Sequence, residues 1–207
     1  MWLDAAFYTG SENWLDNSGN SNNAIFVNPD NAITWVNTFS GVFQSTGNSG
    51  NYLRIPSISL YNTDYTIIGA SRFLNPANPS HRIITSSNNW FLGHWNDTVL
   101  DYYVNDGFVH GPEGSADTQW RIYAGTGSLN TSPKNFKFYV NGTKLADGPS
   151  PDGANVGHGP QEIQLLGESL FNETTNGQIG FLLVYNRILS DTEILNIFNT
   201  YRSRYGL

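Results

Sequence analysis

The sequence predicts an all-β protein built as an antiparallel sandwich or barrel. Short alternating or apolar runs recur along its 207 residues, with clusters of Asn, Gly, Ser and Pro between them that are typical of turns. Aromatic residues make up 14% of the chain and charged residues only 13%, whereas an amphipathic helical bundle carries far more Lys, Glu, Leu and Ala. The length suits one domain with a real core, so we expect residues 1–207 to form a single domain.

Each expected strand is a short run of β-branched, aromatic or aliphatic residues bounded by turn residues. In chain order the expected strands are 2–7, 24–27, 33–36, 41–45, 52–55, 66–73, 82–85, 90–95, 100–104, 119–124, 134–140, 163–166 and 178–185. So many short strands at this spacing favour a sandwich or a barrel.

Two hairpins can be predicted from local sequence. In H-R-I-I-T-S-S-N-N-W-F-L-G-H-W, a turn on Ser87-Asn88 places Ile83 opposite Leu92. Both faces of this hairpin are largely apolar, so we expect it to lie centrally in a sheet. In K-N-F-K-F-Y-V-N-G-T-K-L-A, the pair Asn141-Gly142 supplies a turn that requires positive φ.

One helix is predicted, at the C terminus. Ser190 and Glu193 have the spacing of a capping box, in which each side chain bonds the other residue's backbone N–H. Gly206 provides the stop signal. The apolar residues that recur at helical spacing are Ile194, Leu195, Phe198 and Tyr201. We therefore expect one amphipathic helix laid against the sandwich.

Three segments, taken in order, resemble the laminin-G-like branch of the concanavalin A-like lectin/glucanase superfamily. They are W-L-D-A followed by W-L-D-N-S-G-N-S-N-N, then N-N-W-F-L-G-H-W followed by D-Y-Y-V-N-D-G-F-V, and finally G-F-L-L-V-Y-N-R-I-L-S-D-T-E-I with the terminal R-Y-G-L. The resemblance spans nearly the whole chain and implies a single antiparallel jelly-roll sandwich, concanavalin A-like, with one short C-terminal α-helix. It does not fix the function, because similar domains occur in secreted bacterial proteins and in phage structural proteins.

We expect the chain not to be an enzyme. Some glycosidases of the superfamily carry two carboxylates on one strand in an E-x-D-x-x-E pattern, because retaining hydrolysis needs a nucleophile and an acid about 5 Å apart. The sequence contains no such motif, and it contains no nucleophile elbow, phosphate-binding glycine loop or H-E-x-x-H.

The segment 90–108 is the best candidate for a ligand site. Jelly-roll lectins bind sugars with aromatic faces and with amide or carboxylate oxygens, which suit a CH-rich ring edged by hydroxyls. We expect Trp95 and Tyr102 to point outward as sugar contacts. Tyr103 is a further candidate contact, and the alternative is that Trp90, Phe91 and Tyr103 fill the core. Any single aromatic residue here is alternatively a core residue, because strand alternation turns about half of them inward. The candidate ligand-binding residues are Trp95, Tyr102, Asn96, Asp101, His94 and Trp120, with Asn105 and Asp106 as further polar groups.

Two groups of residues are candidate metal sites, and each can also be explained without a metal. Asp16, Ser18 and Asn20 alternate oxygen ligands as calcium loops do, and laminin-G-like relatives sometimes bind calcium. Only one carboxylate is present and no acid closes the loop, so a plain turn is favoured. His81 and His94 would face each other across the first hairpin, but no third ligand is evident. We expect no cofactor, with calcium as the open alternative.

Charge and hydropathy exclude some classes of binding partner. The formal net charge of −7 argues against nucleic acid, which needs a basic stripe on its binding protein. No apolar run approaches the roughly 20 residues of a membrane span, so we expect no membrane insertion. No signal-peptide pattern follows Met1. We therefore expect either a domain excised from a longer protein or a small protein that leaves its cell by lysis or assembly.

The sequence therefore predicts a non-catalytic recognition or structural module, displayed on a virion surface as a decoration, capsid or tail-fibre-associated protein. Its partners would be other virion structural proteins or a host-surface glycan, bound weakly. The alternative is a carbohydrate-binding domain of a secreted bacterial protein. Either way the chain lies on a virion surface or outside the cell. A homo-oligomer is a further alternative, because jelly-roll proteins with exposed edge strands often assemble.

Overall fold

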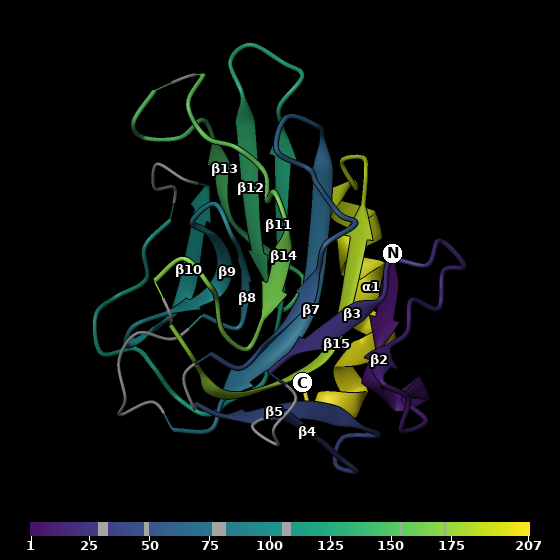
Figure 1. Cartoon of the computed structure of the whole chain (residues 1–207). Coiled ribbons are helices and arrows are strands. Elements are labelled where there is room, and N and C mark those ends of the chain that lie inside the picture. Colours follow the sequence, from purple (N-terminus) through teal and green to yellow (C-terminus); the bar gives the residue numbers. More distant parts are fainter. Residues whose placement is uncertain (29–32, 48–49, 76–81, 105–108, 154, 172) are drawn as a thin grey trace.

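The structure is a computed structural model of the whole chain, and it describes residues 1–28, 33–47, 50–75, 82–104, 109–153, 155–171 and 173–207 (Figure 1). Within these residues the strands form two antiparallel sheets, which confirms the predicted jelly-roll sandwich. The larger sheet has the order β13 (Thr143–Gly148), β12 (Asn135–Val140), β11 (Arg121–Ser128), β7 (Tyr65–Phe73), β15 (Asn176–Tyr185), β5 (Val42–Thr46) and β4 (Ile33–Val36), and β1 (Trp2–Asp4) also pairs with β15. The smaller sheet has the order β10 (Thr98–Val104), β9 (Trp90–Trp95), β8 (Ile84–Ser86), β14 (Ile163–Leu165), β6 (Tyr52–Ile55), β3 (Ala24–Val27) and β2 (Asn13–Trp14).

The two predicted hairpins form, one of them with a shifted register. The Asn141-Gly142 turn is confirmed, with φ of 51° and 76° at its two residues. In the other hairpin Ile84, and not Ile83, pairs with Leu92. The loop between β8 and β9 is one residue longer than expected, because Asn89 adopts a φ of 58° and joins it. A one-residue slip moves every side chain of β8 to the opposite face of the sheet.

The first strand ends earlier than the sequence predicts. β1 stops at Asp4, and residues Ala5–Phe7 form the 3₁₀ helix η1. The cause is local, because the Asp4 side chain accepts a hydrogen bond from the backbone N–H of Ala6 at 3.0 Å and so caps the turn. The short strand β2 lies in a stretch where no strand was expected.

The two ends of the chain meet at an ion pair that we call the Asp4–Arg204 latch. Arg204 lies on η2 (Arg202–Tyr205) and donates through Nη1 to Oδ1 of Asp4 at 2.5 Å. The same guanidinium donates to the carbonyl oxygens of Phe39 at 2.5 Å and Gly41 at 2.6 Å. W-L-D-A and R-Y-G-L, two of the segments that carry the family resemblance, are therefore in direct contact.

Apolar side chains of the described residues form two cores. The first lies between the two sheets and contains large rings such as Trp14, Tyr65 and Trp90. The second covers the outer face of the larger sheet, where α1 (Asp191–Tyr201) and η2 pack beside β15 (Figure 1). The predicted capping box of α1 is confirmed, with both reciprocal hydrogen bonds between Ser190 and Glu193. In the described part of the chain no helix is both long and apolar enough to cross a membrane.

Candidate functional site

Aromatic rings cover the outer face of the smaller sheet along β9 and β10. Phe91 and Tyr103 are direct partners in the ladder, and their rings stack almost parallel, with centroids 5.1 Å apart. Trp95 lies four residues after Phe91 on the same face, and the two ring centroids are 5.7 Å apart. Because side chains alternate along a strand, Leu92 and His94 point into the core. Trp95 and Tyr103 are half-buried and present ring surface to solvent.

These rings form one wall of a hollow of about 240 Å³. Pockets for drug-sized ligands measure roughly 300–1,000 Å³, so this hollow suits a single small ring with the rest of its ligand outside. Among the described residues the hollow is lined by Phe91, Trp95, Asp101, Tyr103, Val109, His110 and Pro151. We call it the Asp101 pocket.

Asp101 supplies the negative charge of the pocket. Its Oδ1 accepts hydrogen bonds from Nδ1 of His110 at 2.7 Å and from the backbone N–H of Gly111 at 3.1 Å. Its Oδ2 is buried and has no hydrogen-bond partner among the described residues. Burial raises the pKa of this carboxyl, although the two hydrogen bonds oppose the shift. An unpaired buried acceptor costs free energy until a donor reaches it.

The set of ligand residues predicted from the sequence lacks five residues of the described pocket lining, namely Phe91, Tyr103, Val109, His110 and Pro151. The sequence left Tyr103 as either a sugar contact or a core residue, and the pairing of β10 with β9 shows that it points outward. His110 arrives because Val109 forms a bridge with Tyr102 beside β10, and its ring then packs edge-on against Trp95 at 5.6 Å. Pro151 comes from the loop after β13, far away in the chain. No local sequence signal marks the last two.

Tyr102 and His94, both predicted to contact a ligand, point into the core, and the expected outward orientation of Tyr102 is wrong. Tyr102 is 0% exposed, and its hydroxyl lies 2.6 Å from the hydroxyl of Tyr65. His94 is also 0% exposed and packs edge-on against Phe73 and Tyr123, with centroid distances of 4.5 and 5.0 Å. Burial lowers the pKa of His94 to about 3, so its ring is neutral at physiological pH.

Two further predicted ligand residues also lie outside the pocket. Trp120 is buried in the second core, on the larger sheet, where it packs against Tyr205 at 4.5 Å and Phe39 at 5.3 Å. Asn96 occupies the turn between β9 and β10, with a φ of 52°. Of the predicted set, the structure therefore brings Trp95 and Asp101 together. Three other residues considered from the sequence lie outside the described residues, namely His81, Asn105 and Asp106.

Comparison with protein families gives a match to a laminin-G-like model described as the concanavalin A-like lectin/glucanases superfamily. The match covers residues 45–195. The chain belongs to this superfamily. The resemblance drawn from the sequence segments is thereby confirmed. A search of curated proteins finds no significant match.

Solved structures similar to this concanavalin A-like domain share its fold at low sequence identity. The binding domain of Paraclostridial Mosquitocidal Protein 1 is 17% identical, with a TM-score of 0.66, over 97% of this chain and 51% of that one. Trypanosoma rangeli sialidase in complex with sialic acid is 12% identical, with a TM-score of 0.66, over 98% and 33%. Domain 4 of AbnA, a GH43 extracellular arabinanase from Geobacillus stearothermophilus, in complex with arabinotriose, is 14% identical, with a TM-score of 0.65, over 95% and 96%. The chain thus spans about half of the toxin binding domain and a third of the sialidase.

In the Asp16 loop, hydrogen bonds within the chain occupy the side-chain oxygens of Asp16 and Ser18, two of the three candidate calcium ligands. Oδ1 of Asp16 accepts hydrogen bonds from the backbone N–H groups of Trp2 and Ser18, both at 2.9 Å, and Oδ2 accepts one from Asn22 at 3.1 Å. The Ser18 hydroxyl oxygen accepts from the Asn20 amide at 2.9 Å. N–H donors therefore point where a cation would need free oxygens. Among the described residues no group of three or more His, Cys, Asp or Glu could hold a metal.

Replacing Asp16 with Asn should lower the free energy of unfolding by about 2 kcal/mol at pH 7. Burial raises the pKa of Asp16, but the hydrogen bonds from Trp2, Ser18 and Asn22 outweigh it and bring the pKa to about 2. Because the folded pKa is lower than the unfolded value near 4, the stabilisation is complete above pH 4 and is lost as the pH falls through about 2.

Urea unfolding from pH 7 to pH 2 measures this effect, with the exposed Asp152→Asn as the control. A deficit in Asp16→Asn that stays constant over this range would contradict the assignment. Thermal unfolding of the wild type in millimolar Ca²⁺ is expected to show no change in midpoint, and an increase would restore the calcium interpretation of the loop.

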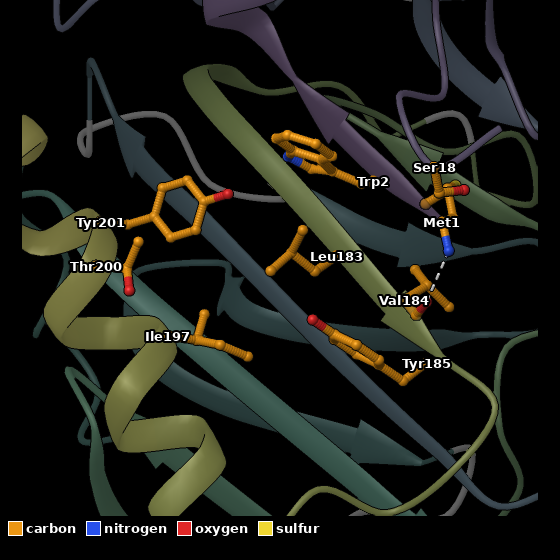
Figure 2. A pocket seen from close by; sticks show the side chains of 9 residues that line it. All are labelled: Met1, Trp2, Ser18, Leu183, Val184, Tyr185, Ile197, Thr200 and Tyr201. Carbon is orange, nitrogen blue, oxygen red and sulfur yellow. Dashed lines mark hydrogen bonds between the residues drawn. The ribbon is translucent and has the colours of Figure 1, made fainter.

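A second hollow of this concanavalin A-like domain, of about 410 Å³, lies between α1 and β15. Figure 2 shows Leu183 near its centre, with Trp2 above it, Tyr201 and Ile197 on the side of the helix, and Tyr185 below. None of the described residues that line it is Asp, Glu, Asn or Gln. It therefore lacks the amide and carboxylate oxygens that would orient a sugar, and the Asp101 pocket is the better candidate site.

Proposed function

We propose that the chain is a non-catalytic carbohydrate-binding module that holds one sugar residue of a glycan in the Asp101 pocket. One observation carries the proposal: a buried carboxylate oxygen without a partner lies beside aromatic rings that are open to solvent. A sugar has an apolar CH face and an edge of hydroxyl donors. The CH face would pack on Trp95 and Tyr103, and one hydroxyl would donate to Oδ2 of Asp101.

Two further findings support a binding module. The superfamily includes lectins, and the similar arabinanase domain is in complex with arabinotriose. Among the described residues that line the pocket, Asp101 is the one carboxylate, whereas retaining and inverting glycosidases both use two. A pocket with a single carboxylate suits recognition of a sugar and not its hydrolysis.

Two settings fit such a module. The first is display on a virion surface, where the partners are virion structural proteins and a host glycan. The second is a domain of a secreted bacterial protein, which is supported by the fold's occurrence in an extracellular arabinanase and as part of a longer toxin domain. Mass spectrometry of purified particles and of culture supernatant separates the two settings.

A glycan array followed by calorimetry tests the proposed function. The wild type is expected to bind a selective set of glycans, and Asp101→Asn to weaken that binding at least tenfold. The reason is that the charge-assisted hydrogen bond to Oδ2 is worth about 1.5–3 kcal/mol. Glu113→Gln is the matched control, because it removes one negative charge from an exposed residue outside the pocket lining. Unchanged affinity in Asp101→Asn would exclude this pocket as the site.

A further inference from the structure

The Asp101 pocket contains one carboxyl group among its described lining residues, and burial keeps that group away from bulk water. The Asp101 side chain lines the hollow and is only 2% exposed, and its buried Oδ2 has no partner among the described residues. Ionised carboxylates only accept hydrogen bonds, so this oxygen needs a donor. A second anion placed here would be a like charge at short distance in a medium with little water to screen it.

The described part of the pocket lining offers no cation to offset that charge. Recognition of a carboxylate or sulfate usually employs an Arg or Lys, most often the fork of a guanidinium. Neither Arg nor Lys is among the described residues that line this hollow. Its basic residue, His110, already directs Nδ1 to Asp101 at 2.7 Å.

Arg82 contacts a lining residue of the pocket, but its charge is already paired inside the protein. Arg82 packs over the ring of Phe91, with its guanidinium carbon 4.6 Å from the centroid. It is 4% exposed, and it pairs with Glu173 at 2.6 Å and donates to Asn89 at 2.6 Å. Its charge is therefore neutralised inside the protein and is not presented to a ligand in the pocket.

Resting on the proposed function, we propose that the Asp101 pocket selects uncharged sugars and rejects sialylated, uronic or sulfated ones. The ligand residue presents an unsubstituted CH face to Trp95 and Tyr103, and at least one free hydroxyl on its edge to Asp101. Acidic glycans bind poorly at the same contact with Asp101, because they place an anion where a hydroxyl donor is needed. The net charge of −7 acts in the same direction at longer range.

Matched glycan pairs test this selectivity. Lactose is compared with 3′-sialyllactose, and a soluble glucan with a polyuronate of similar length, by calorimetry at pH 7.5 in 0.15 M salt. The wild type is expected to bind at least one uncharged member at least tenfold more tightly than its acidic counterpart. Asp101→Asn should reduce this ratio of affinities, because it weakens binding of the uncharged glycan and strengthens binding of the acidic one. Glu113→Gln should leave the ratio unchanged.

The possible results distinguish failure of the proposed selectivity from failure of the proposed carbohydrate-binding function. Binding of an acidic glycan as tight as its uncharged counterpart, and lost in Trp95→Ala, would overturn the selectivity and leave the carbohydrate-binding function standing. A ratio that persists in Asp101→Asn would also overturn it, because the discrimination would then come from another group. Binding that is insensitive to Trp95→Ala for every glycan would defeat the proposed function, and the selectivity with it.

Discussion

Replacing Arg204 with Ala is expected to lower the free energy of unfolding by about 3–5 kcal/mol. The substitution removes one partner of the Asp4–Arg204 latch and leaves the other carboxylate buried, since the Asp4 side chain is only 5% exposed. It also removes the donors to the carbonyl oxygens of Phe39 and Gly41. Breaking a buried pair costs far more than the pair contributes net, because the remaining charge has lost both water and partner.

Urea unfolding followed by tryptophan fluorescence measures this loss. Arg202→Ala is the matched control, because Arg202 is exposed on the same 3₁₀ helix, and it should change stability by less than about 0.5 kcal/mol. The double variant Asp4→Leu with Arg204→Met should lose less than Arg204→Ala alone, because no unpaired charge remains. A stability of Arg204→Ala within the error of wild type would show that water replaces the latch.

Replacing Trp95 with Ala is expected to weaken glycan binding by roughly 30- to 100-fold, about 2–3 kcal/mol, with little loss of stability. Trp95 provides a half-buried ring at the mouth of the Asp101 pocket, and its removal takes away both the apolar platform and the wall that excludes water. Tyr103→Ala should act in the same direction, because Tyr103 stacks on Phe91 on the same face.

Two controls make this prediction specific. Trp35→Ala removes an equally large ring from β4 on the larger sheet and should leave glycan affinity unchanged. Tyr102→Phe should leave affinity unchanged but lower stability by about 1–3 kcal/mol, because it removes the hydroxyl shared with Tyr65 inside the core. Loss of binding in Tyr102→Phe without loss of stability would reverse the assignment of the two tyrosines.

Features fixed by neighbouring residues could be predicted from the sequence. The capping box of Ser190 and Glu193 and the Asn141-Gly142 turn both form as expected, because each depends on backbone preferences and hydrogen bonds within a few residues. The length of the β8–β9 loop could not be predicted, because the local sequence allows two turns. One has the two residues Ser87-Asn88, and the other also includes Asn89. The choice of register depends on packing against the other sheet.

The candidate site could be predicted only in part for the same reason. D-Y-Y-V contains two adjacent tyrosines, and the local sequence does not say which of them faces outward. The pairing of Tyr102 with Leu92 and of Tyr103 with Phe91 decides it, and that pairing belongs to the sheet. Trp95 and Asp101 could be found because they belong to one hairpin. His110 and Pro151 reach the pocket through tertiary structure, so periodicity and motifs could not reveal them.

The Asp4–Arg204 latch joins residues 200 positions apart in the chain, and β1 pairs with β15 across almost the same interval. Contacts of such long sequence separation form late, because the entropy of closing the intervening loop must be lost first. During synthesis we therefore expect the segment Trp2–Asp4 to lack its strand pairing until β15 and η2 have left the ribosome. Folding of this domain is expected to be slow and to finish at its C-terminal end, and the early strands need protection from aggregation until then.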